Sequence, residues 1–221
     1  MHALHQVLHA FFNPHSFTLA LPDVWAGFQL NLQMMFIAEA LVLVFALIVA
    51  IAYTDFFRGT PIIIVAFIVG FGLPGLQLGF ISNRSITAYG ILALTLVYTA
   101  YVSEVFRAGI ESVHASQRSA ARSLGLTYAQ AMRYVVVPQA IRRVIPPLLN
   151  DFIGLQKDTA IVSVIGVTEA ASLANQFSSQ NGDFASYVVA AVFFILITIP
   201  LARFTDHLVA ERESRERAQA F

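Results

Sequence analysis

Apolar residues gather along the chain in long stretches separated by shorter polar segments. A helix that crosses a membrane needs about 20 mostly apolar residues, and five stretches reach that length. They cover Leu30–Tyr53, Thr60–Phe80, Ile86–Phe106, Val144–Thr168 and Phe184–Phe204. The alternation that is typical of membrane barrels is absent from the sequence. Because helices satisfy their own backbone hydrogen bonds in lipid, the pattern predicts an all-α membrane protein with about five transmembrane helices.

Composition agrees with a chain surrounded by lipid. Hydrophobic residues make up 57% of the 221 positions and charged residues only 12%, about half the usual share for soluble domains. A soluble domain of this size has no means of hiding so much apolar surface from water. The net charge of zero indicates neither an acidic nor a basic partner, and the absence of cysteine excludes disulfides. We therefore expect a multi-pass protein of the cell membrane.

Basic residues predict the direction in which the chain crosses the membrane, since they stay on the cytoplasmic side. Of the 13 basic residues, 11 fall on one side of the five-span arrangement. These are Arg58, Arg107, Arg118, Arg122, Arg133, Arg142, Arg143, Arg203, Arg212, Arg215 and Arg217. The prediction is an extracytoplasmic segment over residues 1–24, a membrane domain over 25–207 and a cytoplasmic tail over 208–221. The N-terminus is then outside and the C-terminus inside.

Groups suited to catalysis do not form a recognisable pattern. A phosphate-binding loop needs Gly-x4-Gly-Lys-Ser/Thr, but the single lysine, Lys157, lies between Gln156 and Asp158. Histidines are scattered near the N-terminus without acidic or cysteine partners, so we expect no metal site there. We predict that the chain is not an enzyme, has no catalytic residues and binds no cofactor itself.

The predicted cytoplasmic loop between the third and fourth spans has order of its own over residues 111–138. Residues 117–124 indicate a two-turn helix that ends at Gly125, a residue type suited to a left-handed helix end. Thr127 and Gln130 have the spacing of a capping box for a second helix, and Pro138 is predicted to stop it. Two interpretations fit: a helical hairpin resting on its own membrane domain, or a docking surface for a cytoplasmic partner.

Residues of this loop carry a resemblance to a known family. Ser119-Ala120-Ala121, three residues, Gly125, nine residues and Val135-Val136-Val137-Pro138 resemble the Glu-Ala-Ala-x3-Gly-x9-Ile-x-Leu-Pro motif of permeases of ATP-binding-cassette (ABC) importers. The spacing is kept. Serine replaces glutamate and two valines replace isoleucine and leucine, so an ion pair made by the family's glutamate is not expected here.

Further motifs resemble the permeases for polar amino acids such as histidine, glutamine, glutamate, arginine and opines. They are Phe57-Arg58-Gly59-Thr60-Pro61, Gly72-Leu73-Pro74, the stretch from Tyr101 to Ile110, Pro138-Gln139-Ala140 and Gln156-Lys157-Asp158-Thr159. The resemblance covers about residues 25–207. One departure is the first inside loop, residues 54–59, which is shorter than the family pattern leads us to expect.

Charged residues within the predicted spans are candidates for a transport path, because a charge at mid-bilayer costs roughly 2.5–3.5 kcal/mol. Lys157 and Asp158 offer a cation and an acceptor for a zwitterionic amino acid, or alternatively a structural ion pair within the fourth span. Glu104 ends the third span, where pairing with Arg107 at i,i+3 is the simpler interpretation. The candidate path consists of Arg58, Glu104, Lys157, Asp158 and Thr159.

The resemblance implies a type-I importer permease that works by alternating access. A second permease subunit, identical or homologous, encloses the path, and a cytoplasmic ATPase dimer, which holds ATP and Mg²⁺, docks on Ser119, Ala120, Ala121, Gly125 and Pro138. An extracytoplasmic binding protein delivers the amino acid, and nucleic acid is not an expected partner. The rival interpretations are a secondary transporter or channel that uses Glu39 or Asp158, and a membrane scaffold without transport. The loop argues against both.

Overall fold

The computed structural model describes residues 13–45, 51–77 and 79–219, and within these ranges the chain is helical and contains no strand. Its α-helices are α2 (Pro14–Phe45), α3 (Ile51–Gly59), α4 (Ile62–Phe67), α5 (Leu73–Gly75), α6 (Gly79–Ser82), α7 (Ile86–Glu111), α8 (Ala115–Ser123), α9 (Tyr128–Ala131), α10 (Val137–Asp158), α11 (Ala170–Asn181) and α12 (Ala185–Gln219). The prediction of an all-α protein is confirmed.

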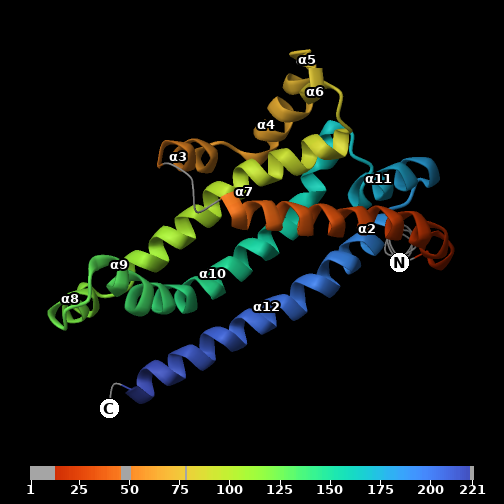
Figure 1. Cartoon of the computed structure of the whole chain (residues 1–221). Helices are drawn as coiled ribbons and strands as arrows, with labels where there is room; N and C mark the ends of the chain where they lie inside the picture. Colours follow the sequence, from red (N-terminus) through yellow and green to blue (C-terminus); the bar gives the residue numbers. More distant parts are fainter. Residues whose placement is uncertain (1–12, 46–50, 78, 220–221) are drawn as a thin grey trace.

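Three long helices, α7, α10 and α12, run in a similar direction, and α2 crosses them (Figure 1). Helix α10 packs against both α7 and α12, while α2 contacts α7, α11 and α12. The short helices α8 and α9 lie at one end of the molecule, α11 lies toward the other, and α4 to α6 project away from the long helices. The main apolar core joins α2, α7 and α10 through buried residues such as Met34, Leu94 and Leu155.

Two described helices are long and apolar enough to cross a membrane, Ile86–Glu111 and Ala185–Glu211. They correspond to the third and fifth predicted spans. Two bent pairs raise the number to four if each pair is one span: Tyr53–Gly59 with Ile62–Gly75, bent by 103°, and Tyr128–Ile165 with Ala170–Asn181, bent by 54°. The first bend lies between Gly59 and Ile62, at the start of the second predicted span, and the second lies between Ile165 and Ala170, at the end of the fourth. The count of five stays a prediction.

The N-terminal part of the chain is helical from Pro14 onward, and its division into an extracytoplasmic segment and a membrane domain stays a prediction. Helix α2 begins at Pro14 and runs to Phe45, so the expected boundary after residue 24 lies inside a helix. Val24 is fully buried in an apolar cluster with Phe28 from the same helix and with residues of α11 and α12. This packing against distant helices orders the segment, and local sequence gives no signal of it. Residues 1–12 and 46–50 lie outside the described residues.

The short loop before the second span is helix α3, which lies along α7. The Tyr53 hydroxyl donates to the Leu96 carbonyl at 2.6 Å, and the hydroxyls of Thr54 and Ser103 are 3.2 Å apart. The chain then turns sharply at Gly59 and Thr60 into α4. Helical structure thus replaces the longer loop that the family pattern leads us to expect.

The prediction that Pro138 ends the second loop helix is wrong. Helix α9 continues through a π-helical turn, Met132–Val136, directly into α10, and Pro138 sits in the first turn of α10. A proline lacks an N–H donor and its ring clashes with the carbonyl one turn earlier; a wide π turn moves that carbonyl aside. The Gln139 side chain donates to the Val135 carbonyl at 3.0 Å and supplies a donor there. A π-helical segment likewise precedes Pro74.

Helix α2 approaches the start of α11 so closely that Gly27 leaves no room for a side chain. A Cβ at this position would lie 2.7 Å from the Ala170 nitrogen and 2.6 Å from the Leu173 Cδ1 atom. Gly27→Val should therefore lower the free energy of unfolding by about 1–3 kcal/mol through overpacking. The apparent melting temperature in detergent measures the effect, with Gly75→Ala as the control because its added Cβ meets nothing within 4 Å. Equal melting temperatures for the two variants would contradict this account.

Candidate functional site

The first candidate site is the loop between α7 and α10, which begins with helix α8. Gly125 has a φ angle of +87°, the left-handed conformation expected for it. The Gly125 N–H donates to the Arg122 carbonyl at 3.0 Å, and the Leu126 N–H to the Ala121 carbonyl at 3.3 Å. These two bonds form a Schellman motif. The predicted glycine end of this helix is confirmed, and it fixes the direction in which the chain leaves α8.

Both short helices of the loop have side-chain caps at their starts. The Gln130 N–H donates to Thr127 Oγ1 at 3.3 Å and the Thr127 N–H donates to Gln130 Oε1 at 2.9 Å, which confirms the predicted capping box. At the start of α8, the Nδ1 atom of His114 accepts from the Ser116 N–H at 3.3 Å. The sequence analysis did not identify this second cap, since histidine is an uncommon N-cap residue.

One side of the loop rests on the membrane domain. Val113, Val136 and Ala140 form a small buried cluster with Met132 packed against it, and Arg143 of α10 donates to the Ser112 carbonyl. Ala121 is also buried. The base of the loop is therefore fixed to α10, whereas α8 itself packs against the π-helical turn and α9.

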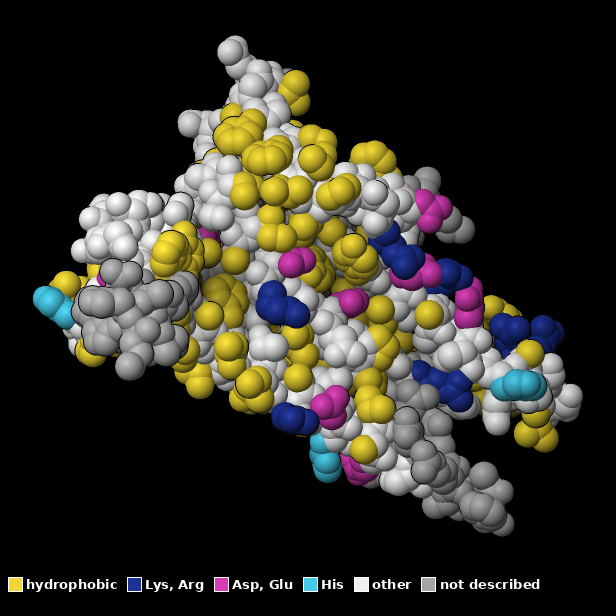
Figure 2. Space-filling view, turned by 180° about the vertical axis from the view of Figure 1, so that it is seen from behind, with side chains coloured by type: hydrophobic (Ala, Val, Ile, Leu, Met, Phe, Trp, Pro, Cys, Tyr) yellow, Lys and Arg dark blue, Asp and Glu magenta, His cyan; other side chains and the backbone are white. Residues whose placement is uncertain are grey.

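The other side of the loop is open. Ser119 and Ala120 are exposed, and so are three large apolar side chains: Leu124, with 83% of its surface accessible, Tyr128 and Tyr134. Figure 2 shows Lys and Arg side chains gathered toward the end of the molecule that carries α8 and α9, whereas the middle of the same face is largely hydrophobic. Exposed arginines of this end are Arg107, Arg118, Arg122, Arg133 and Arg142. This combination of apolar and basic groups suits a protein partner.

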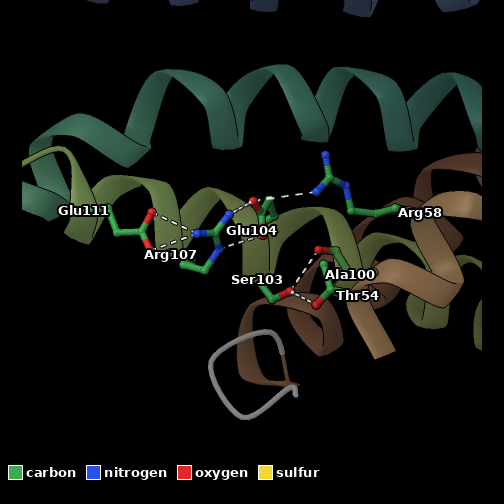
Figure 3. A network of polar contacts seen from close by, with 7 residues as sticks. All are labelled: Thr54, Arg58, Ala100, Ser103, Glu104, Arg107 and Glu111. Carbon is green, nitrogen blue, oxygen red and sulfur yellow. Dashed lines mark hydrogen bonds and ion pairs between the residues drawn. The ribbon is translucent and has the colours of Figure 1, made fainter. Parts of the chain in front are cut away.

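A chain of ion pairs follows α7 toward the same end (Figure 3). The Arg107 guanidinium bonds to both carboxylate oxygens of Glu104 and, at 2.8 Å, to both of Glu111. Arg58 of α3 approaches Glu104 at 3.7 Å. The structure thus forms the expected Glu104–Arg107 pair and brings the two path candidates Arg58 and Glu104 together. These groups are largely exposed, so the pairs contribute little to stability on their own.

The second candidate site is the polar end of α10. Asp158 accepts a hydrogen bond of 2.9 Å from the Tyr98 hydroxyl of α7, and Gly154 leaves room for this contact, since a Cβ there would lie 2.9 Å from the hydroxyl oxygen. Lys157 is exposed, and among the ion pairs of the described residues it joins neither Asp158 nor Asp151. The alternative of a structural pair between Lys157 and Asp158 is therefore not formed.

Two carboxyl groups near this region each keep a buried oxygen without a hydrogen-bond partner in the described chain. They belong to Glu39 of α2 and Asp151 of α10. Burial of such an oxygen costs free energy unless water, a ligand or a proton satisfies it. Glu39 and Asp151, two acidic residues of the predicted spans, thus each have one carboxylate oxygen that no group of the described chain satisfies.

Thr159 lies in a buried polar network that the sequence analysis missed. Its hydroxyl accepts from Asn31 Nδ2 at 3.1 Å, and the same amide donates to Glu169 Oε2 at 3.0 Å. Glu169 also caps α11, accepting from the N–H groups of Ala171 and Ser172 at 2.8 and 2.7 Å. Asn31 and Glu169 each lie within an apolar stretch of the sequence. Because an unpaired polar side chain in lipid costs free energy, their positions were the signal that could have indicated a buried network.

Comparisons with known proteins agree with these features. The model of the family described as "Binding-protein-dependent transport system inner membrane component" matches residues 48–213, which include the loop and the polar end of α10. The chain belongs to this family. Its members are translocation components and are not themselves enzymes, and this holds for the chain as one of them.

Individual relatives within this family are permease proteins of amino-acid ABC transporters. The chain is 40% identical over 158 residues to the probable glutamine ABC transporter permease protein GlnM of Bacillus subtilis (strain 168), covering 71% of each protein. It is 38% identical over 149 residues to the arginine transport system permease protein ArtQ of the same organism, covering 66% of this chain and 67% of the relative. A solved structure described as "Crystal structure of an amino acid ABC transporter with histidines" matches with a TM-score of 0.73 and 33% identity, covering 87% of this chain and 94% of that one.

The contact between Tyr98 and Asp158 leads to a test of packing at the polar end of α10. Tyr98→Phe removes the hydroxyl and leaves a half-buried carboxyl group without this donor, so the free energy of unfolding should fall by about 1–3 kcal/mol. Tyr101→Phe is the matched control, since this more exposed tyrosine lies on the same helix and contacts Tyr98 ring to ring. A larger drop in melting temperature for Tyr101→Phe than for Tyr98→Phe would contradict the assignment.

Proposed function

We propose that the chain is the membrane-spanning permease subunit of an ATP-driven importer that carries polar amino acids across the cell membrane. Membership of the family supports a transport role, and the names of the relatives support amino acids as substrates. The observation that supports coupling to an ATPase subunit is the structure of the loop around α8. This loop contains a short helix that packs against the π-helical turn and α9, with exposed apolar and basic side chains on its open side.

The partners of this proposal follow from the division of labour in such an importer. A cytoplasmic ATPase dimer binds ATP and Mg²⁺ and receives α8 at Ser119, Ala120 and Gly125, with Ala121 buried behind them and Pro138 at the base of the loop. A second permease subunit, identical or homologous, completes the transport path. An extracytoplasmic binding protein delivers the amino acid on the opposite side of the membrane.

The transport path of the proposal passes the polar end of α10. Lys157 is an exposed cation suited to a substrate carboxylate, and Asp158 is an acceptor suited to an ammonium group. Thr159 stabilises this segment through the hydrogen bond from its hydroxyl to the Gln156 carbonyl. Arg58 and Glu104, joined at 3.7 Å, line the end of the path nearest the ATPase. The residues act by charge and hydrogen bonding, and the energy for transport enters through the partner.

The topology of the proposal has five spans, with α8 in the cytoplasm and the N-terminus outside. Because the chain has no cysteine, single cysteines report the side of the membrane without interference. Gln180→Cys in α11 should react with an impermeant thiol reagent from outside, and Ser123→Cys in α8 only after the membrane is opened. Both positions are exposed. Labelling of position 123 in intact cells would overturn the topology.

The angle between α8 and α9 gives a test of coupling to ATP. Gly125→Val requires a β-branched side chain in a left-handed conformation that is costly for it, so α8 should leave its direction. We expect normal insertion into the membrane, but loss of the ATPase subunit on co-purification, or ATP hydrolysis without uptake.

Gly125→Asn is the control, because asparagine tolerates the left-handed conformation and should retain most of the uptake. Full uptake by Gly125→Val would contradict the role of the loop. Uptake that continues without ATPase and collapses with the ion gradient would instead favour a secondary transporter.

A further inference from the structure

Consecutive side chains at the end of α10 are held by different helices. The Gln156 side chain is buried and its Oε1 atom accepts from the Thr198 hydroxyl of α12 at 3.0 Å. Asp158 accepts from Tyr98 of α7 at 2.9 Å. Lys157 lies between these two residues and is exposed. The backbone on both sides of this lysine is therefore anchored, while its own side chain is left open.

The third anchored residue is Thr159, and its partner, Asn31, comes from α2. The Thr159 hydroxyl donates to the Gln156 carbonyl at 2.7 Å and accepts from Asn31 Nδ2 at 3.1 Å. Asn31 is in turn fixed by the start of α11: its second amide hydrogen goes to Glu169 Oε2 at 3.0 Å, and its oxygen accepts from the Ala170 N–H at 2.9 Å. Asn31 thus uses both its donors and its acceptor within the protein.

At Thr159 the helix changes character. The α-helical α10 ends at Asp158, and residues Thr159–Ile165 form a 3₁₀-helix, which rises about 2.0 Å per residue instead of about 1.5 Å. The change of helix type lies two residues after Lys157. Asn31, with 2% of its surface exposed, holds the first residue of the new segment.

We propose that Asn31 is a positioning residue for transport: by holding Thr159, it fixes the last turn of α10 so that Lys157 faces the transport path. The inference rests on the proposed function. Glu169 has a supporting part, because it receives the other hydrogen of the Asn31 amide and caps α11 with the same carboxylate. Neither Asn31 nor Glu169 touches the substrate in this arrangement.

The test is a double-mutant cycle on uptake by the complete importer in membrane vesicles, with radiolabelled glutamine and arginine as probes. Asn31→Leu and Lys157→Met should each lower the initial rate at saturating substrate about threefold to tenfold, the range that a lost hydrogen bond corresponds to. If Asn31 acts through Lys157, the double variant should be no slower than Lys157→Met alone. Losses that multiply, or a normal rate for Lys157→Met, would overturn the inference.

Controls separate positioning from folding. Gln33→Leu changes an exposed residue of the same helix and should leave the rate unchanged. Thr159→Val removes only the hydroxyl from a similar shape and should reproduce the Asn31→Leu result if that variant fails to fold. A normal rate for Thr159→Val would overturn the inference.

A second readout does not depend on transport. Lys157→Cys gives the chain a single cysteine, whose reaction rate with a water-soluble thiol reagent reports how the position faces. Adding Asn31→Leu should change this rate about threefold or more, the size expected for a lost hydrogen bond, whereas Gln33→Leu should not. An unchanged rate, or no reaction at position 157 in the assembled importer, would overturn the inference. Absence of any ATP-dependent uptake by the unaltered importer would instead count against the proposed function, and the labelling would still decide where position 157 faces.

Discussion

Every backbone polar group in lipid must find its partner inside the protein, and this constraint shapes the irregular points of the chain. A helix in water can leave a carbonyl or a hydroxyl to the solvent. Here Thr95 returns its hydroxyl to the carbonyl of Ile91 four residues earlier, and the Gln139 side chain donates to the Val135 carbonyl in the π-helical turn. Asn31 is satisfied on all sides. The breaks in the helices occur where such partners exist.

The same constraint explains how the two candidate sites belong to one structure. After α8 the chain turns at Gly125 and enters α9. From α9 the helical backbone continues without interruption through a π-helical turn into α10. The far end of α10 carries Lys157 and Asp158, and the corner beyond it is tied to α2 through Asn31 and Glu169. The two candidate sites thus lie at opposite ends of the same helix, α10.

Sequence reasoning predicted those features that local chemistry dictates. The helical class, the glycine end of α8 at Gly125 and the capping box of Thr127 depend on neighbouring residues alone, and all three were predicted correctly. The early start of α2 at Pro14 depends on contacts with α11 and α12, which no local pattern reveals. Pro138 was misread because a proline usually ends a helix, whereas here the wide π-helical turn before it moves the clashing carbonyl aside.

In the candidate sites, too, contacts within one helix could be predicted from the sequence, whereas contacts between distant helices could not. The Glu104–Arg107 pair follows from spacing on one helix. The separation of Lys157 from Asp158 does not, since Tyr98 on another helix takes the aspartate. Glu169 shows the limit most clearly: its partner Asn31 is 138 positions away in sequence, and without an alignment nothing links two isolated polar residues at that distance.

The unbroken helical run from Tyr128 to Ile165 has a mechanical consequence. It contains 38 residues (165 − 128 + 1), the last seven of them in the 3₁₀-helix, so at about 1.5 Å per residue, and about 2.0 Å in the 3₁₀-helix, it measures roughly 60 Å, about twice the thickness of the hydrocarbon core of a bilayer. A rod of that length that tilts by about 10° around its midpoint moves its two ends by about 5 Å in opposite directions. A displacement of the Tyr128 end would therefore appear as a movement of the Ile165 end in the opposite direction.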